Sequence, residues 1–73
     1  MSNEKEILMA FGKRVLQLRE KKELSQMDLA YEIGTSTSHL SKIENGHTGP
    51  GLLTLMRLAR ALEVKPGDLL NDL

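Results

Sequence analysis

The sequence predicts an all-α fold, a compact arrangement of five short helices. Two observations lead to this prediction: apolar residues recur at steps of three and four, and capping residues and glycines separate the periodic segments. No segment alternates apolar and polar residues over the length of a strand. With 73 residues the chain has room for one domain, so we expect residues 1–73 to form a single unit. A domain this small buries only about 60% of its unfolded surface, and self-association would supplement its thin stability margin.

The first and longest predicted helix runs from Glu4 to Lys22. Its apolar side chains form one stripe, which we expect to face the core, and they are Ile7, Leu8, Phe11, Val15 and Leu18. The same helix carries the most cationic strip of the chain, because residues 13–22 contain five basic side chains and one acidic side chain, a local charge of +4.

A second helix is predicted directly after Ser25. This serine stands where an N-cap is needed, and Asp28 follows three residues later in the spacing of a capping box. The helix stops at Gly34, since glycine commonly ends a helix. Its inner face consists of Leu29, Ala30 and Ile33.

A third helix follows the turn Gly34-Thr35-Ser36, is capped by Ser36 and ends at Asn45-Gly46. Projection at about 100° per residue places Ser36, Leu40, Ile43 and Glu44 inward. The outward side chains are Ser38, Lys42 and Asn45, flanked by Thr37 and Ser41 on one side and by His39 on the other. They include no acid, and such donors and acceptors can contact base edges in a major groove or the phosphates beside it. A solvated surface without a ligand is the alternative.

The segment 47–51, His-Thr-Gly-Pro-Gly, predicts a turn before a fourth helix from Leu52 to Leu62. This helix is expected to bury Leu55, Leu58, Ala59 and Leu62. Pro66 fits the first position of a fifth helix that carries Leu69 and Leu70. Leu53 and Met56 lie off the inner stripe of the fourth helix, which makes them candidates for a dimer interface. Alternatively, Leu53 covers the corner between the last two helices.

Composition excludes several other functions. The chain has no cysteine, hence neither a disulfide nor a thiolate metal site, and nothing in its N-terminus predicts a signal peptide or a membrane span. We therefore expect a cytoplasmic protein without membrane contact. His39 and His47 are the only histidines and have no third ligand at metal spacing, so no metal site is expected. No catalytic or phosphate-binding signature is present, so we expect no enzyme, no cofactor and no small-molecule ligand.

Residues 12–70 resemble the lambda-repressor-like family of helix-turn-helix proteins, also called the Cro-type or XRE family. The segments that carry the resemblance are GKRVLQLREKKELSQ, DLAYEIGTSTSHLSKIENG, GPGLLTLMRLARALEV and PGDLL. The resemblance implies a helix-turn-helix at residues 25–45. It also implies a sequence-specific, double-stranded-DNA-binding transcriptional regulator, encoded by a bacterium or a phage and associated with the nucleoid. Members of this length include phage-type repressors and controller proteins of restriction–modification systems.

The resemblance also implies roles for individual residues. Gln26 would hydrogen-bond a phosphate and brace the third helix, while Ser25 would offer its hydroxyl or its backbone N–H to the same strand. Arg19 would pair with the inward Glu44, because a buried carboxylate needs a cation. The side chains placed to read bases are Thr37, Ser38 and Lys42, with His39 and Ser41 as helpers. Ser36, the cap of the helix, is also expected to contact DNA. The segment that contacts the DNA backbone comprises Asn45 and the loop residues His47, Thr48 and Gly49. For Gln26 and Asn45, pure capping and turn chemistry is the alternative.

The chain departs from the family pattern at two kinds of position. Glu23 and Glu63 stand where many relatives have glycine, and a positive φ at either would cost about 1 kcal/mol. His47 and Thr48 replace basic residues, and residues 23–47 carry a local charge of −3. Affinity should therefore depend on a homodimer bound to a palindromic or pseudo-palindromic operator, with recognition helices about 34 Å apart. The alternative function is a protein-interaction module, such as an antitoxin-like partner, built on the same fold.

Overall fold

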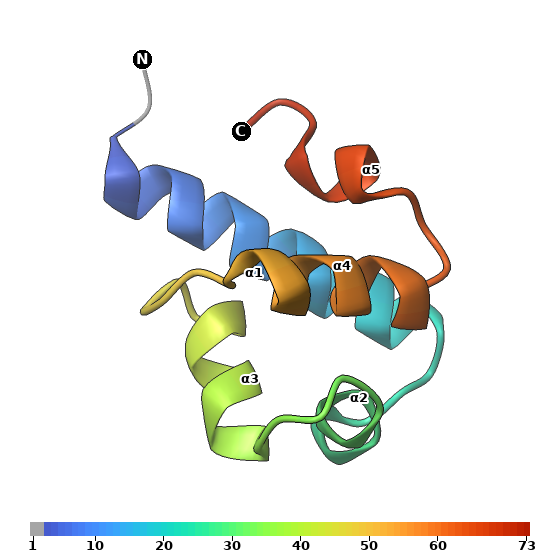
Figure 1. Ribbon diagram of the computed structural model, residues 1–73. Helices are drawn as coiled ribbons and strands as arrows, with labels where there is room; N and C mark the ends of the chain where they lie inside the picture. The colour runs from blue at the N-terminus through green and yellow to red at the C-terminus, as the bar shows by residue number, and fades with distance from the viewer. Residues whose placement is uncertain (1–2) are drawn as a thin grey trace.

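The computed structural model describes residues 3–73, which form five helices and no strand (Figure 1). The helices are α1 Glu4–Lys21, α2 Gln26–Glu32, α3 Thr37–Glu44, α4 Leu52–Ala61 and α5 Pro66–Leu70. The predicted all-α fold is confirmed, and each helix begins and ends within two residues of its predicted position. None of the helices in this part of the chain combines the length and the apolar character that a membrane crossing requires.

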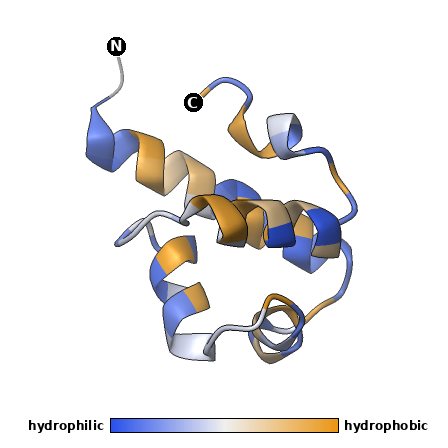
Figure 2. Ribbon diagram, in the orientation of Figure 1, coloured by the Kyte–Doolittle hydropathy of each residue, from blue (hydrophilic) through white to orange (hydrophobic). Residues whose placement is uncertain are grey.

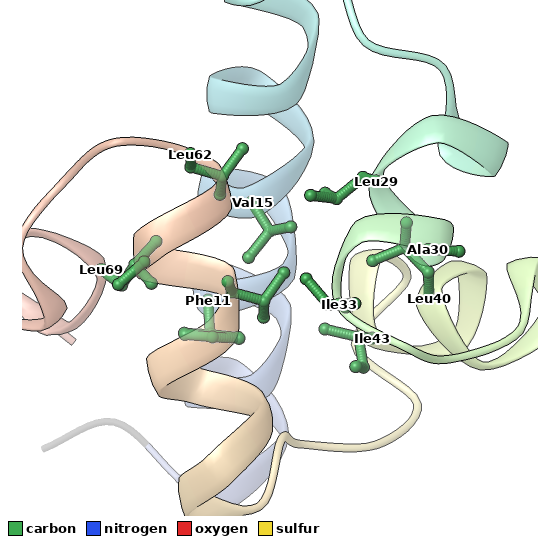
Figure 3. Close-up of a cluster of buried hydrophobic side chains, with 11 residues drawn as sticks. Phe11, Val15, Leu29, Ala30, Ile33, Leu40, Ile43, Leu62 and Leu69 are labelled. Atoms are coloured by element: carbon green, nitrogen blue, oxygen red, sulfur yellow. The ribbon is translucent and has the colours of Figure 1, made fainter.

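The five helices surround one apolar core. Helix α1 packs against α3 and α5, α2 packs against α3 and α4, and α4 packs against α5. Figure 3 shows side chains of α1, α2, α3 and α4 meeting in the space between these helices, with Leu69 added from α5. The buried apolar residues are Phe11, Val15, Leu29, Ala30, Ile33, Leu40, Ile43, Leu58, Ala59, Leu62 and Leu69.

Some residues that the helical projection placed on the inner face are not buried. Ile7 is 37% exposed because it lies one turn before Phe11, the first residue of the core. Leu8, Leu18 and Leu55 are only half-buried, and of these Leu18 and Leu55 pack against the core. In the short helix α5, Leu69 is buried and the next residue, Leu70, is exposed.

The inward placement of Ser36 was wrong, since this residue is exposed. Its backbone is extended, with φ −87° and ψ 156°, because Ser36 is the N-cap of α3 and precedes the helix. A projection at 100° per residue does not apply to such a residue. The Ser36 hydroxyl oxygen accepts a hydrogen bond from the His39 backbone N–H at 3.0 Å and so caps the helix.

The first four helices end in the same way, with a left-handed residue and two closing backbone hydrogen bonds of the Schellman type. At the ends of α2 and α3 the left-handed residue is Gly34 or Gly46. At the ends of α1 and α4 it is Glu23 or Glu63, each with φ +58°. Both glutamates therefore adopt the positive φ considered from the sequence, at about 1 kcal/mol each relative to glycine.

Helix α3 lies against the backbone of α1 at Gly12. A Cβ atom at this position would lie 2.2 Å from the Ile43 carbonyl oxygen and 2.6 Å from that of Glu44. Glycine within a helix costs about 1 kcal/mol relative to alanine, and here it permits the close contact of the two helices. The last turn of α3 is consequently seated directly on the middle of α1.

Candidate nucleic-acid interface

The angle between α2 and α3 is fixed by the turn Gly34-Thr35-Ser36. The Thr35 N–H donates to the Ala30 carbonyl at 2.9 Å, which closes the end of α2. Ser36 then caps α3, so the turn ends α2 and begins α3 at fixed residues. The two helices meet in the helix–turn–helix arrangement visible in the lower part of Figure 1. The sequence placed this unit at residues 25–45, and the two helices with their caps occupy that range.

The inner face of α3 holds it in place. Leu40 and Ile43 have no exposed surface, and the Glu44 side chain is only 1% exposed. Arg19 donates to this carboxylate from Nε at 2.7 Å and from Nη2 at 3.2 Å. A third hydrogen bond reaches Glu44 from the Gln26 amide nitrogen at 2.8 Å. A buried charge is tolerated when it is paired and hydrogen-bonded, and Glu44 meets both conditions.

The Arg19 guanidinium is fixed from two sides. Besides its bonds to Glu44, its Nη1 donates to the Leu24 carbonyl at 2.9 Å. The hydrogen bond to Glu44 raises the pKa of Arg19 above its ordinary value. We call Arg19, Gln26 and Glu44 the bracing cluster. It joins the end of α1, the start of α2 and the end of α3 through charge-assisted hydrogen bonds.

The geometry at Gln26 determines which amide atoms remain free. A carboxylate only accepts hydrogen bonds, so the nitrogen of the Gln26 amide must face Glu44. One further amide N–H and the amide oxygen stay available toward solvent, and the residue is half-buried. The side chain therefore braces α3 and still carries a donor for a phosphate oxygen.

Ser25 has fewer free hydrogen-bond donors for a ligand than the sequence predicted. Its hydroxyl oxygen accepts from the Asp28 N–H at 3.0 Å, and its own N–H donates to the Asp28 carboxylate at 3.1 Å. This hydrogen bond from the Ser25 backbone lowers the pKa of Asp28. The predicted capping box is confirmed. Because the box uses the backbone N–H, only the hydroxyl hydrogen of Ser25 remains to be donated to a ligand.

The outer face of α3 is polar and lacks acidic side chains. Thr37, Ser38 and Lys42 are exposed, and none of their side chains forms a hydrogen bond within residues 3–73. Asn45 donates to the Ser41 hydroxyl at 3.3 Å. Figure 2 shows the start of α3 in neutral and hydrophilic colours, in contrast to the hydrophobic colours of its inward positions. We define the outer face as Thr37, Ser38, His39, Ser41, Lys42 and Asn45.

The loop after α3 is shaped by backbone hydrogen bonds. The His47 N–H donates to the Lys42 carbonyl at 2.9 Å, and Asn45 is the C-cap of the helix. His47 is exposed, whereas Thr48 is half-buried and its hydroxyl lies 3.5 Å from the Gly49 carbonyl. Asn45 and His47 are therefore accessible beside the outer face, while Thr48 offers less of its surface.

Lys42 is the only cation of the outer face. The acid closest to it in sequence on α3, Glu44, is neutralised by Arg19 in the interior. The cationic strip of residues 13–22 lies on α1 and its C-cap Lys22, and its Arg19 is used by the bracing cluster. The outer face thus presents hydrogen-bonding groups with one positive charge.

Three structurally important residues were not identified from the sequence. Thr35 places its hydroxyl 2.7 Å from Nδ1 of His39, and a spacing of four residues was the available signal. Gly12 interrupts an otherwise periodic helix, and that interruption could have indicated the contact with α3. Arg14 donates to the Leu69 carbonyl at 3.2 Å at the end of α5, a contact without a sequence signal.

Comparisons with known proteins give consistent results. A family model described as "Helix-turn-helix" (HTH_3) matches residues 15–69. The control protein C.BamHI of Bacillus amyloliquefaciens is 36% identical over 66 residues, which cover 89% of this chain and 82% of that protein. Two further relatives, named as an HTH-type transcriptional regulator and an HTH-type transcriptional repressor, are longer, and the matches span 24% and 42% of their lengths.

Two solved structures are close in fold and in length. The restriction–modification controller protein C.AhdI from Aeromonas hydrophila has a TM-score of 0.82 and 37% identity, covering 85% of this chain and 94% of that one. The P22 c2 repressor protein, solved in complex with a synthetic operator, has a TM-score of 0.80 and 31% identity, covering 84% and 92%.

Proposed function

This chain belongs to the helix-turn-helix family of DNA-binding transcriptional regulators, and we propose that it reads a major groove with the outer face of α3 and acts as a homodimer. The observation that carries the proposal is the division of α3 into a braced inner face and an outer face without acidic side chains. A rigid helix with free donors and acceptors meets the requirements of direct readout. The site of action is then the DNA of a bacterium or a phage, in the cytoplasm.

Apart from His39, each side chain of the outer face has one of two proposed roles. Thr37, Ser38 and Lys42 face the bases, because they are exposed and their side chains form no internal hydrogen bond within the described residues. Around them, a set of residues contacts the phosphates and orients the protein on the duplex. This set comprises Ser25, Gln26, Ser36, Ser41, Asn45, His47 and Thr48.

The proposed dimer uses the exposed apolar side of α4. Leu53 is 67% exposed and Met56 is 48% exposed, and both line a shallow groove of about 460 Å³ that continues to Val64 and Pro66. Figure 2 shows the start of α4 as a strongly hydrophobic segment of the ribbon. A twofold axis at this surface would make the contact self-complementary and bring two recognition helices to successive turns of DNA.

Selection of bound sequences from a random pool of DNA duplexes, at two salt concentrations, tests the DNA-binding proposal. We expect enrichment of a palindromic or pseudo-palindromic sequence with half-sites about 10 base pairs apart. Affinity should fall with salt by a shallow slope, because few phosphate-binding cations are present. Failure to enrich any sequence at low salt would contradict the proposal and favour a role in protein interaction.

Sedimentation of the Leu53→Glu variant tests the dimer. The side chain is mostly exposed, so the variant should fold, but it should sediment as a monomer and lose affinity for the two-half-site duplex. Met27→Glu is the matched control for sedimentation, because Met27 is 71% exposed on α2 and does not line the groove of the proposed dimer, so this variant should keep the dimer. A wild-type protein that stays monomeric at high concentration, both free and on DNA, would refute the dimer.

A further inference from the structure

One side chain of the outer face differs from its neighbours in being held by the turn. Nδ1 of His39 lies 2.7 Å from the hydroxyl oxygen of Thr35, four residues earlier. Thr35 belongs to the turn between α2 and α3, and His39 lies in the first turn of α3. The hydrogen bond therefore connects the turn to the ring of a residue that faces the proposed DNA surface.

The backbones of both partners are also anchored. The Thr35 N–H donates to the Ala30 carbonyl at 2.9 Å as part of the closure of α2. The His39 N–H donates to the Ser36 hydroxyl at 3.0 Å as part of the cap of α3. With backbone and ring both fixed, the imidazole loses little conformational freedom when it meets a ligand. Thr37, Ser38 and Lys42 have no comparable side-chain restraint within the described residues.

The second ring nitrogen, Nε2, is accessible. It has no hydrogen-bond partner within residues 3–73, and no buried side-chain nitrogen or oxygen in that range lacks a partner. His39 is half-buried, so its ring is partly covered while Nε2 reaches the surface. Nε2 is therefore the atom of this ring that is free to contact a ligand.

The Thr35 hydroxyl also influences the chemistry of Nε2. When the hydroxyl donates to Nδ1, the neutral ring carries its proton on Nε2, which is then a donor. In the imidazolium form both nitrogens are donors, and Nδ1 donates to the hydroxyl. Nε2 is thus a donor in two of the three protonation states of the ring.

We propose that Thr35 is a positioning residue for His39 and that His39 determines base preference at one position of each half-site, by donating from Nε2 to a base edge. Guanine fits this donor best in the major groove, because N7 and O6 are adjacent acceptors. The proposal rests on the proposed function, since it requires α3 to lie in the groove. A contact of Nε2 with a phosphate is the competing outcome, and it would carry no base preference.

The test uses the duplex that the wild-type protein selects and a set of duplexes with single base-pair changes. His39→Ala should lose about 5- to 10-fold discrimination at one base pair per half-site and leave preferences elsewhere unchanged. His47→Ala is the matched control, because His47 is an exposed histidine in the loop after α3. It should alter overall affinity or nothing, without a change at a single position.

Two substitutions at Thr35 isolate the hydroxyl. Thr35→Val removes it at nearly constant volume, whereas Thr35→Ser retains it. The valine variant should lose discrimination at the same base pair as His39→Ala, and the serine variant should keep it. Nitrogen-15 NMR of the histidine rings should show a change in the His39 tautomer populations in Thr35→Val and no change in Thr35→Ser. The wild-type ring spectrum reports the tautomer even if the valine variant does not fold.

The possible results separate the two proposals. If the wild-type protein enriches no duplex, the proposed function fails. If it enriches a sequence but His39→Ala weakens all duplexes equally, His39 contacts phosphate and the base-reading inference is refuted. If Thr35→Val preserves both the base preference and the His39 ring signals, the positioning role of Thr35 is refuted.

Discussion

The two faces of α3 have opposite properties, although the helix is only 8 residues long. On the inner face, Leu40 and Ile43 are fully buried and Glu44 accepts three hydrogen bonds from α1 and α2. On the outer face, Thr37, Ser38 and Lys42 are exposed, and their side chains form no hydrogen bond within the described residues. The stability of the domain and its proposed contact with DNA thus depend on different side chains of one helix. Substitutions on the two faces should therefore have separable effects.

The largest effect is expected from breaking the bracing cluster. Arg19→Met leaves the Glu44 carboxylate buried with Gln26 as its remaining partner, and we expect a loss of about 3 kcal/mol in the free energy of unfolding. Thermal and urea unfolding measure this loss. The double variant Arg19→Met with Glu44→Met should recover most of it, since a buried ion pair can be replaced by apolar residues of similar volume. An unchanged melting temperature of Arg19→Met would contradict the role of the cluster.

The next-largest effect on stability is expected at the close contact between α3 and α1. Gly12→Ala would place a Cβ atom 2.2 Å from the Ile43 carbonyl oxygen, so the helices must separate. We expect a destabilisation of about 1–3 kcal/mol, even though alanine favours the helix by about 1 kcal/mol. Gly67→Ala is the control, because a Cβ atom there meets no atom within 4 Å. Equal stability of the two variants in urea would show that the close contact has no energetic importance.

A smaller effect, of opposite sign, is expected at the helix ends. Glu23→Gly relieves a positive φ at the end of α1 and should stabilise the protein by up to about 1 kcal/mol. Glu63→Gly relieves the same strain but also removes the ion pair of Glu63 with Lys22, so its gain should be smaller. Neither substitution alters the outer face, and DNA affinity should remain the same. A melting temperature lowered by Glu23→Gly would refute the strain argument.

Much of the fold could be predicted because local signals agreed with one another. Ser25 and Ser36 begin helices as N-caps, and Gly34 and Gly46 end them at positive φ. Burial was harder to predict at the edges, since it depends on which helix covers a position. Ile7 has the periodicity of a core residue but precedes the core by one turn. Periodicity describes a single helix and not the neighbour that packs on it.

The candidate site was predicted in outline. The division of α3 into faces followed from helical geometry, and the need for a cation beside Glu44 followed from the cost of burying a charge, while the family resemblance indicated Arg19 as that cation. The hydrogen bond between Thr35 and His39 and the use of the Ser25 N–H by Asp28 depend on side-chain rotamers. No pattern of residue types specifies such rotamers. The predicted contacts with DNA stay predictions.

The most direct test of the outer face compares two lysine substitutions that change the net charge equally. Lys42 lies on the outer face, whereas Lys5 is exposed in the first turn of α1, outside both the outer face and the groove of the proposed dimer. Binding of both variants to the selected duplex would be measured over a range of salt concentrations. We expect Lys42→Ala to weaken specific binding by about 1–3 kcal/mol if it reads a base, or to flatten the salt slope by about one unit if it contacts a phosphate. Lys5→Ala should bind like the wild-type protein. Equal behaviour of the two variants would contradict the assignment of the outer face of α3 as the surface that reads DNA.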